Sequence, residues 1–311
     1  MREPELNWGP LLHACKLQIH QGANQFPLAV WQLPTQGPTV ALSRRVLCVH
    51  GFLDSGRSFA HLASHLPNNW EVFAPDLRGH GKSRPLPPGA ATHYWEHAKD
   101  ISMLLEEFQS AQTPFDLVVG HSMGGNVTAL VAASRPALAP QVVFLDMLGG
   151  LPEEPHQQVD RFGEVLAGLR HKKDFKRAAS QAEAINRMQK LNPHLTAQGA
   201  ALMFAANCDQ DEDGSWSFAF EKDLRGKTPF RFPQEFWLAL FERLKGRAWV
   251  VRGEHGYVPT AQDEPIVQTR LHALGLKDFV TFAKAGHHLH VDAVPELSEF
   301  LVQLPSIKNQ Q

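Results

Sequence analysis

The chain reads Val118-Val119-Gly120-His121-Ser122-Met123-Gly124-Gly125 between an apolar run and a stretch of small residues. The apolar run at 116–120 predicts a buried strand, and residues 124–133 predict a helix that follows it without a loop. In this G-x-S-x-G pattern the sharp turn projects the Ser122 hydroxyl beyond the end of a sheet. A Cβ at Gly120 or Gly124 would crowd the turn, so the pattern predicts a nucleophilic serine between two required glycines.

The composition is that of a globular protein with a substantial core. The 311 residues are 43% hydrophobic and 20% charged, which allows one large domain or a domain with an insertion. The net charge of −2 provides no electrostatic attraction for nucleic acid or for an anionic membrane. We therefore expect neither of them as a partner.

Cysteine usage and hydropathy indicate the compartment. No apolar run is long enough to span a bilayer, and residues 1–17 carry no secretory signal pattern. The three cysteines, Cys15, Cys48 and Cys208, are odd in number and far apart, which is typical of a reducing compartment. We expect a cytoplasmic protein, with Cys48 as a small residue of the core.

Strand and helix patterns alternate through the first half of the chain. Apolar runs predict strands at 12–20, 27–33, 45–50, 70–74, 116–120 and 141–146. Helical spacing of apolar residues is found at 58–66, 93–109 and 124–133. The first two strands are expected to pair antiparallel. The alternation that follows predicts an α/β fold, a mostly parallel sheet with helices on both faces.

The alternation stops after residue 147. Residues 148–246 carry helical or irregular patterns around an acidic turn at 209–214, with helices predicted at 159–169, 178–191, 197–206 and 233–244. Strands resume at 247–252 and 278–282, with helices at 261–274 and 294–304. The predicted organisation is a core formed by residues 1–147 and 247–311, with an inserted helical cap at 148–246.

A second loop with a glycine, His50-Gly51-Phe52, follows a predicted buried strand. In acyl-transfer sites on such sheets, the loop in this position supplies one hydrogen-bond donor to the oxyanion. We therefore assign the two oxyanion donors to the backbone N–H groups of Phe52 and Met123. The loss of one such donor typically costs roughly a hundredfold or more in rate.

Three histidines lie close together near the end of the chain, in Ala285-Gly286-His287-His288-Leu289-His290. A serine nucleophile of this kind needs its base on a late loop, after the acid in chain order. His287 is the expected base, with His288 and His290 as alternatives. A metal site is the other interpretation, but adjacent and i+2 positions diverge and no acidic ligand pattern accompanies them, so we expect no metal.

The acid that orients the histidine has two possible sources, the end of the strand after the nucleophile helix and the loop after the next-to-last strand. The first provides Asp146 and the second provides Glu254. We favour Asp146, with Glu254 as the alternative acid and Asp263 as a further candidate. The structural alternative for Asp146 is a strand-end cap that binds backbone N–H groups.

The stretch Asp76-Leu77-Arg78-Gly79-His80-Gly81-Lys82-Ser83 ends another predicted strand. Arginine and histidine beside glycines are compatible with anion binding. We favour a structural role, in which Asp76 ties the loop and Arg78 pairs internally.

Together these stretches resemble the α/β-hydrolase superfamily. The resemblance rests on H-G-F at 50–52, D-L-R-G-H-G-K-S at 76–83, the turn at 120–124 and Gly286-His287. Within the superfamily the chain is similar to the capped serine hydrolase-like group, on residues 50–55, 120–126, 216–218 and 223–225. The resemblance implies the α/β-hydrolase fold, with a mostly parallel eight-stranded sheet, flanking helices and an inserted helical cap.

The resemblance has one departure and one discriminating residue. Many members carry the triad aspartate where this chain has Gly256, and this favours Asp146, which corresponds to the alternative acid of some relatives. Relatives that open epoxides or cleave carbon–halogen bonds use an aspartate at the nucleophile position, so Ser122 implies acyl transfer.

These residues lead to one expected function and two alternatives. We expect a serine hydrolase without a cofactor, monomeric or homodimeric, that cleaves small to medium carboxylic esters through an acyl-enzyme, with a triad of Ser122, His287 and Asp146. The same triad is also compatible with hydrolysis of a carbon–carbon bond, a lactone or an amide, or with perhydrolysis. The alternative from another class is a non-catalytic ligand-binding protein on the same scaffold.

Overall fold

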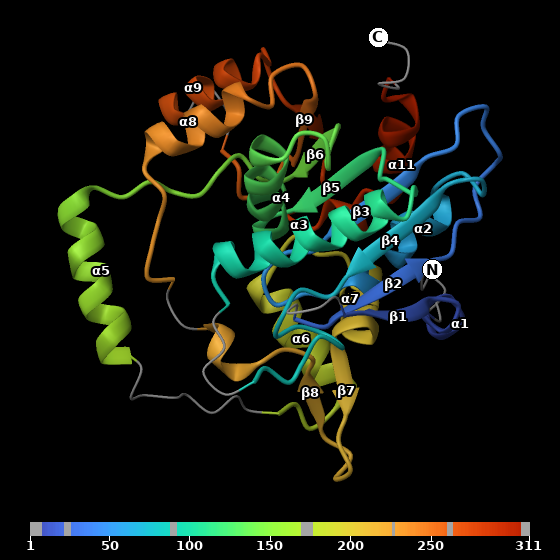
Figure 1. Cartoon of the computed structure of the whole chain (residues 1–311). Coiled ribbons are helices and arrows are strands. Elements are labelled where there is room, and N and C mark those ends of the chain that lie inside the picture. Colours follow the sequence, from blue (N-terminus) through green and yellow to red (C-terminus); the bar gives the residue numbers. More distant parts are fainter. Residues whose placement is uncertain are drawn as a thin grey trace.

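An eight-stranded sheet forms the centre of the molecule in the structure, a computed structural model (Figure 1). The structure describes residues 8–21, 26–87, 92–168, 177–225, 228–259 and 264–305. The strand order is β1-β2-β4-β3-β5-β6-β9-β10. The strands are β1 Lys16–His20, β2 Leu28–Leu33, β3 Arg45–Val49, β4 Glu71–Pro75, β5 Leu117–His121, β6 Val142–Leu145, β9 Ala248–Gly253 and β10 Val280–Phe282.

Most neighbours in this sheet are parallel. β1 pairs antiparallel with β2, and β2 pairs antiparallel with β4, while the strands from β4 to β10 run parallel. The predicted mostly parallel eight-stranded sheet is confirmed. Parallel register places the carboxyl ends of β3, β5 and β6 at one edge, and His50, Ser122 and Asp146 each directly follow one of these ends.

The central strands are buried on both faces, as strands of a covered parallel sheet are. In β3, Val46 and Cys48 join one hydrophobic cluster, while Leu47 and Val49 join the other, because successive side chains point to opposite faces. On the Leu47 face pack α3 Tyr94–Ser110, α4 Met123–Ser134, α8 Gln234–Glu242 and α9 Pro265–Leu274. On the Cys48 face pack α1 Gly9–His13, η1 Gly56–Phe59, α2 Ala60–His65, α7 Ala197–Asn207, α10 Leu289–Asp292 and α11 Val294–Gln303.

The start of the chain differs from the prediction. Residues 12–20 were expected to form one strand, but α1 takes Gly9–His13 and β1 begins only at Lys16. Pro10 in the first turn favours the helix, and the helix buries Leu12 against the Cys48 face. The remaining expected elements are present with shifted ends, and residues 22–25, 88–91 and 260–263 lie outside the described part of the chain.

The segment between β6 and β9 holds all four helices predicted for the cap, with shifted ends. They are α5 Pro155–Gly168, α6 Gln181–Leu191, α7 and α8, with the short helix η2 Lys222–Arg225. The acidic turn predicted at 209–214 connects a small hairpin of β7 Cys208–Gln210 and β8 Trp216–Phe218, which sequence patterns did not indicate. The division into core and cap stays a prediction.

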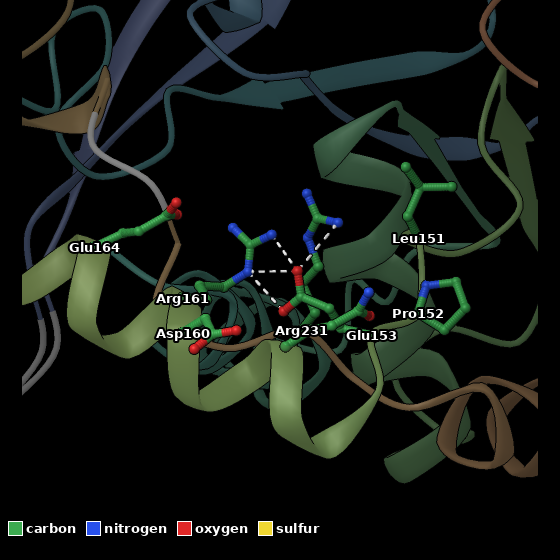
Figure 2. A pocket seen from close by; sticks show the side chains of 8 residues that line it. Leu151, Pro152, Glu153, Asp160, Arg161, Glu164 and Arg231 are labelled. Carbon is green, nitrogen blue, oxygen red and sulfur yellow. Dashed lines mark hydrogen bonds and ion pairs between the residues drawn. The ribbon is translucent and has the colours of Figure 1, made fainter.

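The helices of this segment differ in how they contact the sheet. α5 buries none of its residues and lies to one side of the sheet (Figure 1). Arg161 of α5 and Arg231 both pair with Glu153, as Figure 2 shows, and Gln158 bonds the backbone of residues 229 and 231. α8, in contrast, buries Trp237 and Phe241 against the Leu47 face, so it is a flanking helix of the sheet.

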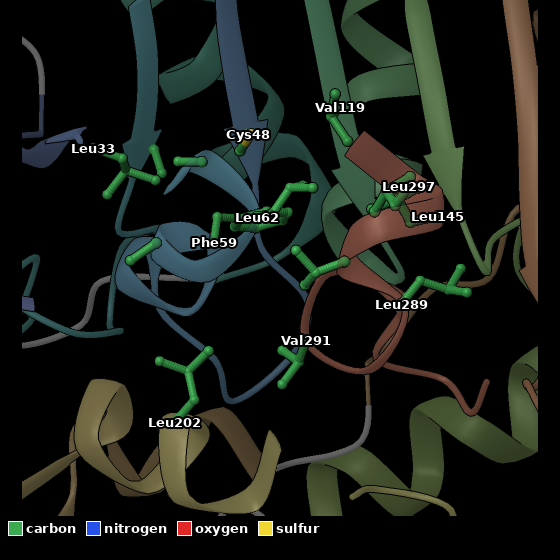
Figure 3. Close-up of a cluster of buried hydrophobic side chains, with 14 of the residues drawn as sticks. Leu33, Cys48, Phe59, Leu62, Val119, Leu145, Leu202, Leu289, Val291 and Leu297 are labelled. Carbon is green, nitrogen blue, oxygen red and sulfur yellow. The ribbon is translucent and has the colours of Figure 1, made fainter. Parts of the chain in front are cut away.

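α7 is also part of the hydrophobic core. Leu202 of α7 is fully buried in the cluster that holds Phe59, Leu289 and Val291, and Figure 3 shows α7 beneath the segments that carry these side chains. The inserted segment therefore contacts the residues that follow β3 and those that follow the late histidines. No helix in the described ranges is both long and apolar enough to cross a membrane.

We predict that the three cysteines of the native protein are nearly unreactive. Burial raises the pKa of Cys15 to about 11 and that of Cys208 to about 12, and it raises the pKa of the Cys48 thiol further. Because the thiolate is the reactive form, a thiol reagent at about pH 8 should label the folded protein very slowly. All three thiols should react after unfolding in guanidinium, and rapid labelling of the folded protein would contradict this burial.

Candidate active site

Ser122 occupies a strained turn between β5 and α4. Its φ is +51° and its ψ is −117°, a conformation that non-glycine residues rarely adopt and that typically costs about 1–3 kcal/mol. The Ser122 N–H donates to Leu145 O at 3.0 Å, and the Ser122 carbonyl accepts from the N–H groups of Gly125 and Asn126. The backbone is therefore held from both sides, by the neighbouring strand and by the first turn of α4.

The glycines around Ser122 permit close backbone contacts. A Cβ at Gly124 would lie 2.3 Å from Val49 O and 2.4 Å from His50 O, and a Cβ at Gly120 would lie 2.6 Å from Gly125 Cα. The crowding expected at these two glycines is thus present. The first turn of α4 packs directly on the end of β3 and brings Ser122 beside the loop that follows β3.

That loop carries the first predicted oxyanion donor. A Cβ at Gly51 would lie 3.2 Å from Ser122 Cβ, so the loop passes directly alongside the serine. Within the described part of the chain, the backbone N–H groups of Phe52 and Met123 have no hydrogen-bond partner. Met123 is the first residue of α4, where the N–H groups have no intrahelical acceptor.

Two histidines stabilise this loop by hydrogen bonds to backbone groups. His50 Nε2 accepts from Leu77 N–H at 2.9 Å, and its Nδ1–H donates to Gly51 O at 2.7 Å. His80 Nε2 accepts from Leu53 N–H at 3.3 Å. Burial lowers the pKa of His80 well below its ordinary value, so the ring is neutral and keeps the lone pair that this bond requires.

The stretch 76–83 has the structural role that we favoured. Asp76 accepts hydrogen bonds from the backbone N–H groups of Gly56 and Lys82, each at 2.7 Å, and from Trp31 Nε1 at 3.0 Å. The Arg78 guanidinium pairs with the buried Asp100 through two bonds of 2.6 Å. These contacts fix the segment that carries His80, which accepts a hydrogen bond from the loop after β3.

Asp146 and His287 lie in direct contact. His287 Nδ1 is 2.5 Å from Asp146 Oδ2, and the Asp146 side chain is fully buried. Asp146 directly follows β6 with a φ of +45°, a left-handed conformation that aspartate tolerates better than most residues. Because the carboxylate accepts the Nδ1–H, the Nε2 lone pair of His287 is left as a base.

The loop after β9 supplies donors to Asp146 instead of an acid. Tyr257 N–H donates to Asp146 Oδ2 at 2.6 Å, and Val258 N–H lies 3.5 Å from Oδ1. A Cβ at Gly256 would lie only 2.1 Å from Asp146 Oδ1. The absence of a side chain at Gly256 is thus what leaves room for the carboxylate of Asp146.

The other candidates for acid and base lie in different surroundings. Glu254 is exposed and accepts a hydrogen bond from Lys284 N–H at 2.8 Å, while Asp263 is outside the described residues. His290 Nε2 faces Ser58 Oγ at 3.1 Å. Burial, with the charges of His287 and His290, lowers the pKa of His288 to about 3.

Tyr257 is a site residue that the sequence patterns did not reveal. Its ring stacks on His287 with centroids 4.0 Å apart and an interplanar angle of 19°, although 66% of the residue is exposed. Tyr257 Oη donates to Asn192 Oδ1 at 3.4 Å, at the end of α6. The tyrosine therefore covers one face of the imidazole and connects it to the inserted segment.

One group of buried side chains has the composition of a metal site. Asp54, His121 and His290 each offer a ligand atom, and these atoms lie within 4.8 Å of one another. Tetrahedral zinc, with bonds of about 2.1 Å, requires ligand atoms about 3.4 Å apart. Both Asp54 oxygens already accept hydrogen bonds, from Ser55 N–H and from the Ser58 hydroxyl, so we treat Asp54 and His290 as parts of a hydrogen-bonded network against which His121 packs.

A cavity of about 550 Å³ lies beside α5 (Figure 2). It is lined by Leu151, Pro152, Glu153, Gln157, Asp160, Arg161, Glu164 and Arg231. Ser122 and His287 are not among these residues, and most of the lining side chains are charged. Because acyl groups bind in predominantly apolar pockets, we do not assign the acyl site to this cavity.

Comparison with known proteins agrees with this architecture. A family model described as alpha/beta hydrolase fold matches residues 44–294. A serine hydrolase-like protein from Danio rerio is 29% identical over 225 residues, 69% of this chain and 66% of the relative. Lipase LipV from Mycobacterium tuberculosis is 40% identical over 102 residues, 33% of this chain and 36% of that lipase. The matches therefore span less than two thirds of the length of either relative.

Solved structures show the same fold. The hypothetical protein PA1622 from Pseudomonas aeruginosa PAO1 has a TM-score of 0.77 and 25% identity, covering 93% of this chain and 100% of that one. A thioesterase domain from the curacin biosynthetic pathway has a TM-score of 0.75 and 20% identity over the same shares, which shows the fold alone.

The chain belongs to the alpha/beta hydrolase fold family. Within this family it is similar to the serine hydrolase-like proteins, as the resemblance predicted.

We predict that the substitution Gly256→Ala disturbs the bond between Asp146 and His287. The new Cβ would lie 2.1 Å from Asp146 Oδ1, and the φ of Gly256 is not in the left-handed region, so this clash is the main effect. The short bond should give the Nδ1 proton of His287 a strongly downfield resonance in proton NMR. The resonance should move upfield or broaden in Gly256→Ala.

The matched control for this prediction is Gly163→Ala, because a Cβ at Gly163 would have no neighbour within 4 Å. The resonance should be unchanged in this control. An unchanged resonance in Gly256→Ala would show that the carboxylate does not depend on the space at this glycine.

Proposed function

We propose that the protein is a serine hydrolase that cleaves small to medium carboxylic esters through an acyl-enzyme. Ser122 is the nucleophile, His287 the general base and Asp146 the acid that orients it. The observation that carries the proposal is the 2.5 Å contact between His287 Nδ1 and the buried Asp146, at the sheet edge where Ser122 adopts its strained turn. Strained backbone concentrates at functional sites.

In the first half-reaction, His287 Nε2 takes the proton of Ser122 Oγ as this oxygen attacks the ester carbonyl carbon. The carbonyl π electrons move to the oxygen, which becomes an oxyanion. The N–H groups of Phe52 and Met123, which have no acceptor among the described residues, would donate to it. When the intermediate collapses, the bond to the alcohol oxygen breaks and His287 gives its proton to the leaving alcohol.

In the second half-reaction, a water molecule replaces the alcohol. His287 takes a proton from the water, the hydroxide attacks the acyl-enzyme carbonyl, and collapse releases the carboxylic acid as Ser122 Oγ regains its proton. Asp146 keeps the proton-bearing nitrogen of His287 at Nδ1 and stabilises the imidazolium that forms in both halves. This sequence of steps uses no cofactor.

The choice of an ester rests on two observations. The turn between β5 and α4 carries a serine, whereas relatives that open epoxides or cleave haloalkanes carry an aspartate there. The intermediate formed on Ser122 is therefore an acyl ester. A relative that matches a third of the chain at 40% identity is named a lipase. We further propose a small-molecule acyl substrate as the partner and a cytoplasmic location.

We predict that the triad variants separate by role. Ser122→Ala and His287→Gln should abolish labelling by a fluorophosphonate and lower kcat for p-nitrophenyl esters by about 10⁵- to 10⁶-fold. Asp146→Asn should lower kcat by about 10⁴-fold, because the imidazole loses its orienting carboxylate. The measurements are probe labelling and initial rates with p-nitrophenyl acetate, butyrate and octanoate.

Glu254→Gln is the matched control, since Glu254 is an exposed carboxylate on the neighbouring loop. It should retain nearly the wild-type rate. A larger loss in Glu254→Gln than in Asp146→Asn would assign the acid to Glu254. If folded wild-type protein neither labels nor turns over esters, lactones, amides or diketones, the protein is a ligand-binding protein rather than a hydrolase.

We predict a smaller effect at Tyr257. Tyr257→Ala removes the ring that covers His287 and should lower kcat by about three- to tenfold, in line with the 0.5–1.5 kcal/mol typical of aromatic pairs. Tyr257→Phe keeps the stacked ring and loses only the bond to Asn192, so its kcat should remain near that of the wild type. Equal losses in both variants would assign the effect to the hydroxyl instead of the ring.

A further inference from the structure

We propose that His121, the residue before the nucleophile, is a positioning residue that holds the His287 loop and the loop after β3 at Ser122, and that His290 and Asp54 brace it. The inference rests on the proposed function, because the geometry it preserves is that of Ser122 and His287. The side chains of His121, Asp54 and His290 come from three separate parts of the chain: the end of β5, the loop after β3 and α10. None of these side chains belongs to the triad.

His121 contacts both loops that flank Ser122. Its Nε2–H donates to the backbone carbonyl of His287 at 2.9 Å, and the two rings lie 4.6 Å apart between centroids. On its other side, a Cβ at Gly51 would lie 2.8 Å from His121 Nδ1. The ring therefore fills the space between the base loop and the oxyanion loop, at the last position of β5.

The protonation state of His121 follows from its surroundings. Burial, with the charges of His290, His287 and His288, lowers the pKa of His121 well below its ordinary value. The ring is thus neutral, with its single proton on Nε2, where the bond to the His287 carbonyl requires it. The Nδ1 atom is buried without a partner in the described part of the chain.

The ring of His290 also packs against His121. The centroids of the two rings are 4.6 Å apart, and the His290 ring stacks on Phe59 at 4.3 Å. The Nε2–H of His290 donates to Ser58 Oγ at 3.1 Å, and the Ser58 hydroxyl donates to Asp54 Oδ2 at 2.9 Å. His290 is completely buried, so its position is fixed by this packing and these bonds.

Asp54 ends the chain of contacts and ties it to the inserted segment. Its Oδ1 accepts from Ser55 N–H at 2.8 Å and from Asn207 Nδ2 at 2.9 Å, and Asn207 is the last residue of α7. Burial alone would raise the pKa of Asp54. The hydrogen bond and charge interaction with His290 outweigh burial and hold the pKa below its ordinary range, so the carboxylate is ionised.

Packing alone does not account for these histidines. His121 Nδ1 and His290 Nδ1 are both buried without a partner among the described residues, and an unpaired buried polar atom destabilises a fold. An aliphatic side chain at either position would avoid this penalty. A buried histidine that destabilises the fold and lies against the loop that carries His287 is better explained by a role in the site than by a role in the core.

Other titratable groups face the same histidines. His287 also faces Asp146, Tyr257 and His288. His290 also faces His288, and it interacts electrostatically with the Asp292 carboxyl. The test must therefore separate the loss of the hydrogen bond from His121 Nε2 from a change in the charge of the site. Uncharged replacements do this, because His121 is itself neutral and its replacement leaves the charge unchanged.

The test compares His121→Leu, which removes the donor, with His121→Gln, whose amide can place an N–H near the position of Nε2. His121→Leu should lower kcat for p-nitrophenyl butyrate by about 10- to 100-fold, since a misplacement near 1 Å costs up to that much. KM should change by less than about twofold, because substrate contacts are intact. His121→Gln should recover most of the lost kcat.

His97→Leu is the matched control, because His97 is another buried histidine, on α3 and outside this network, whose Nδ1 has no partner among the residues that the structure describes. It should leave kcat near the wild-type value. The double variant of His121→Leu and His290→Leu should lose less than the product of the single losses, because both act through one contact. The proposal is overturned if His121→Leu loses no more than His97→Leu, or if His121→Gln loses as much as His121→Leu.

A measurement on the wild-type protein covers the case in which the variants do not fold. Nitrogen-15 NMR of the imidazoles should show His121 neutral with its proton on Nε2 from about pH 5 to about pH 9. A titration in that range, or a proton on Nδ1, overturns the proposal. This readout needs no turnover, so it tests His121 even if the wild type hydrolyses no ester and the proposed function fails.

Discussion

The close approach of α4 to the end of β3 is the contact on which the rest of the site depends. Gly124 leaves so little space that a Cβ would lie within 2.4 Å of two carbonyl oxygens of the chain leaving β3. Since β5 lies between β3 and β6, this contact places Ser122 beside the loops that leave both neighbours. The strain at Ser122, typically about 1–3 kcal/mol, persists because a strand and a helix fix its two sides.

The space at Gly256 determines where the Asp146 carboxylate can lie. The resemblance implied an aspartate of many superfamily members where this chain has Gly256, and the missing side chain leaves the space that the Asp146 carboxylate fills. The loop still takes part, because its N–H groups at Tyr257 and Val258 face Asp146. The carboxylate therefore reaches the same histidine from β6, and the loop after β9 stabilises it instead of carrying it.

Local patterns predicted the sheet, the turn at Ser122 and the candidates Asp146 and His287, because each depends on residues adjacent in sequence. They did not predict α1, where Pro10 and the burial of Leu12 override an apolar run that reads as a strand. Nor did they indicate the contacts of Tyr257 or His121. The bond from His121 to the His287 carbonyl joins residues 166 positions apart, and no periodicity within either segment encodes such a pairing.

The inserted segment is connected to His287 by two routes. One route runs from Asn192, at the end of α6, through Tyr257 to the face of the His287 ring. The other runs from Asn207, at the end of α7, through Asp54, His290 and His121 to the His287 backbone. Because the first route ends on the His287 ring and the second on the His287 backbone carbonyl, we expect substitutions in α6 or α7 to alter the placement of His287.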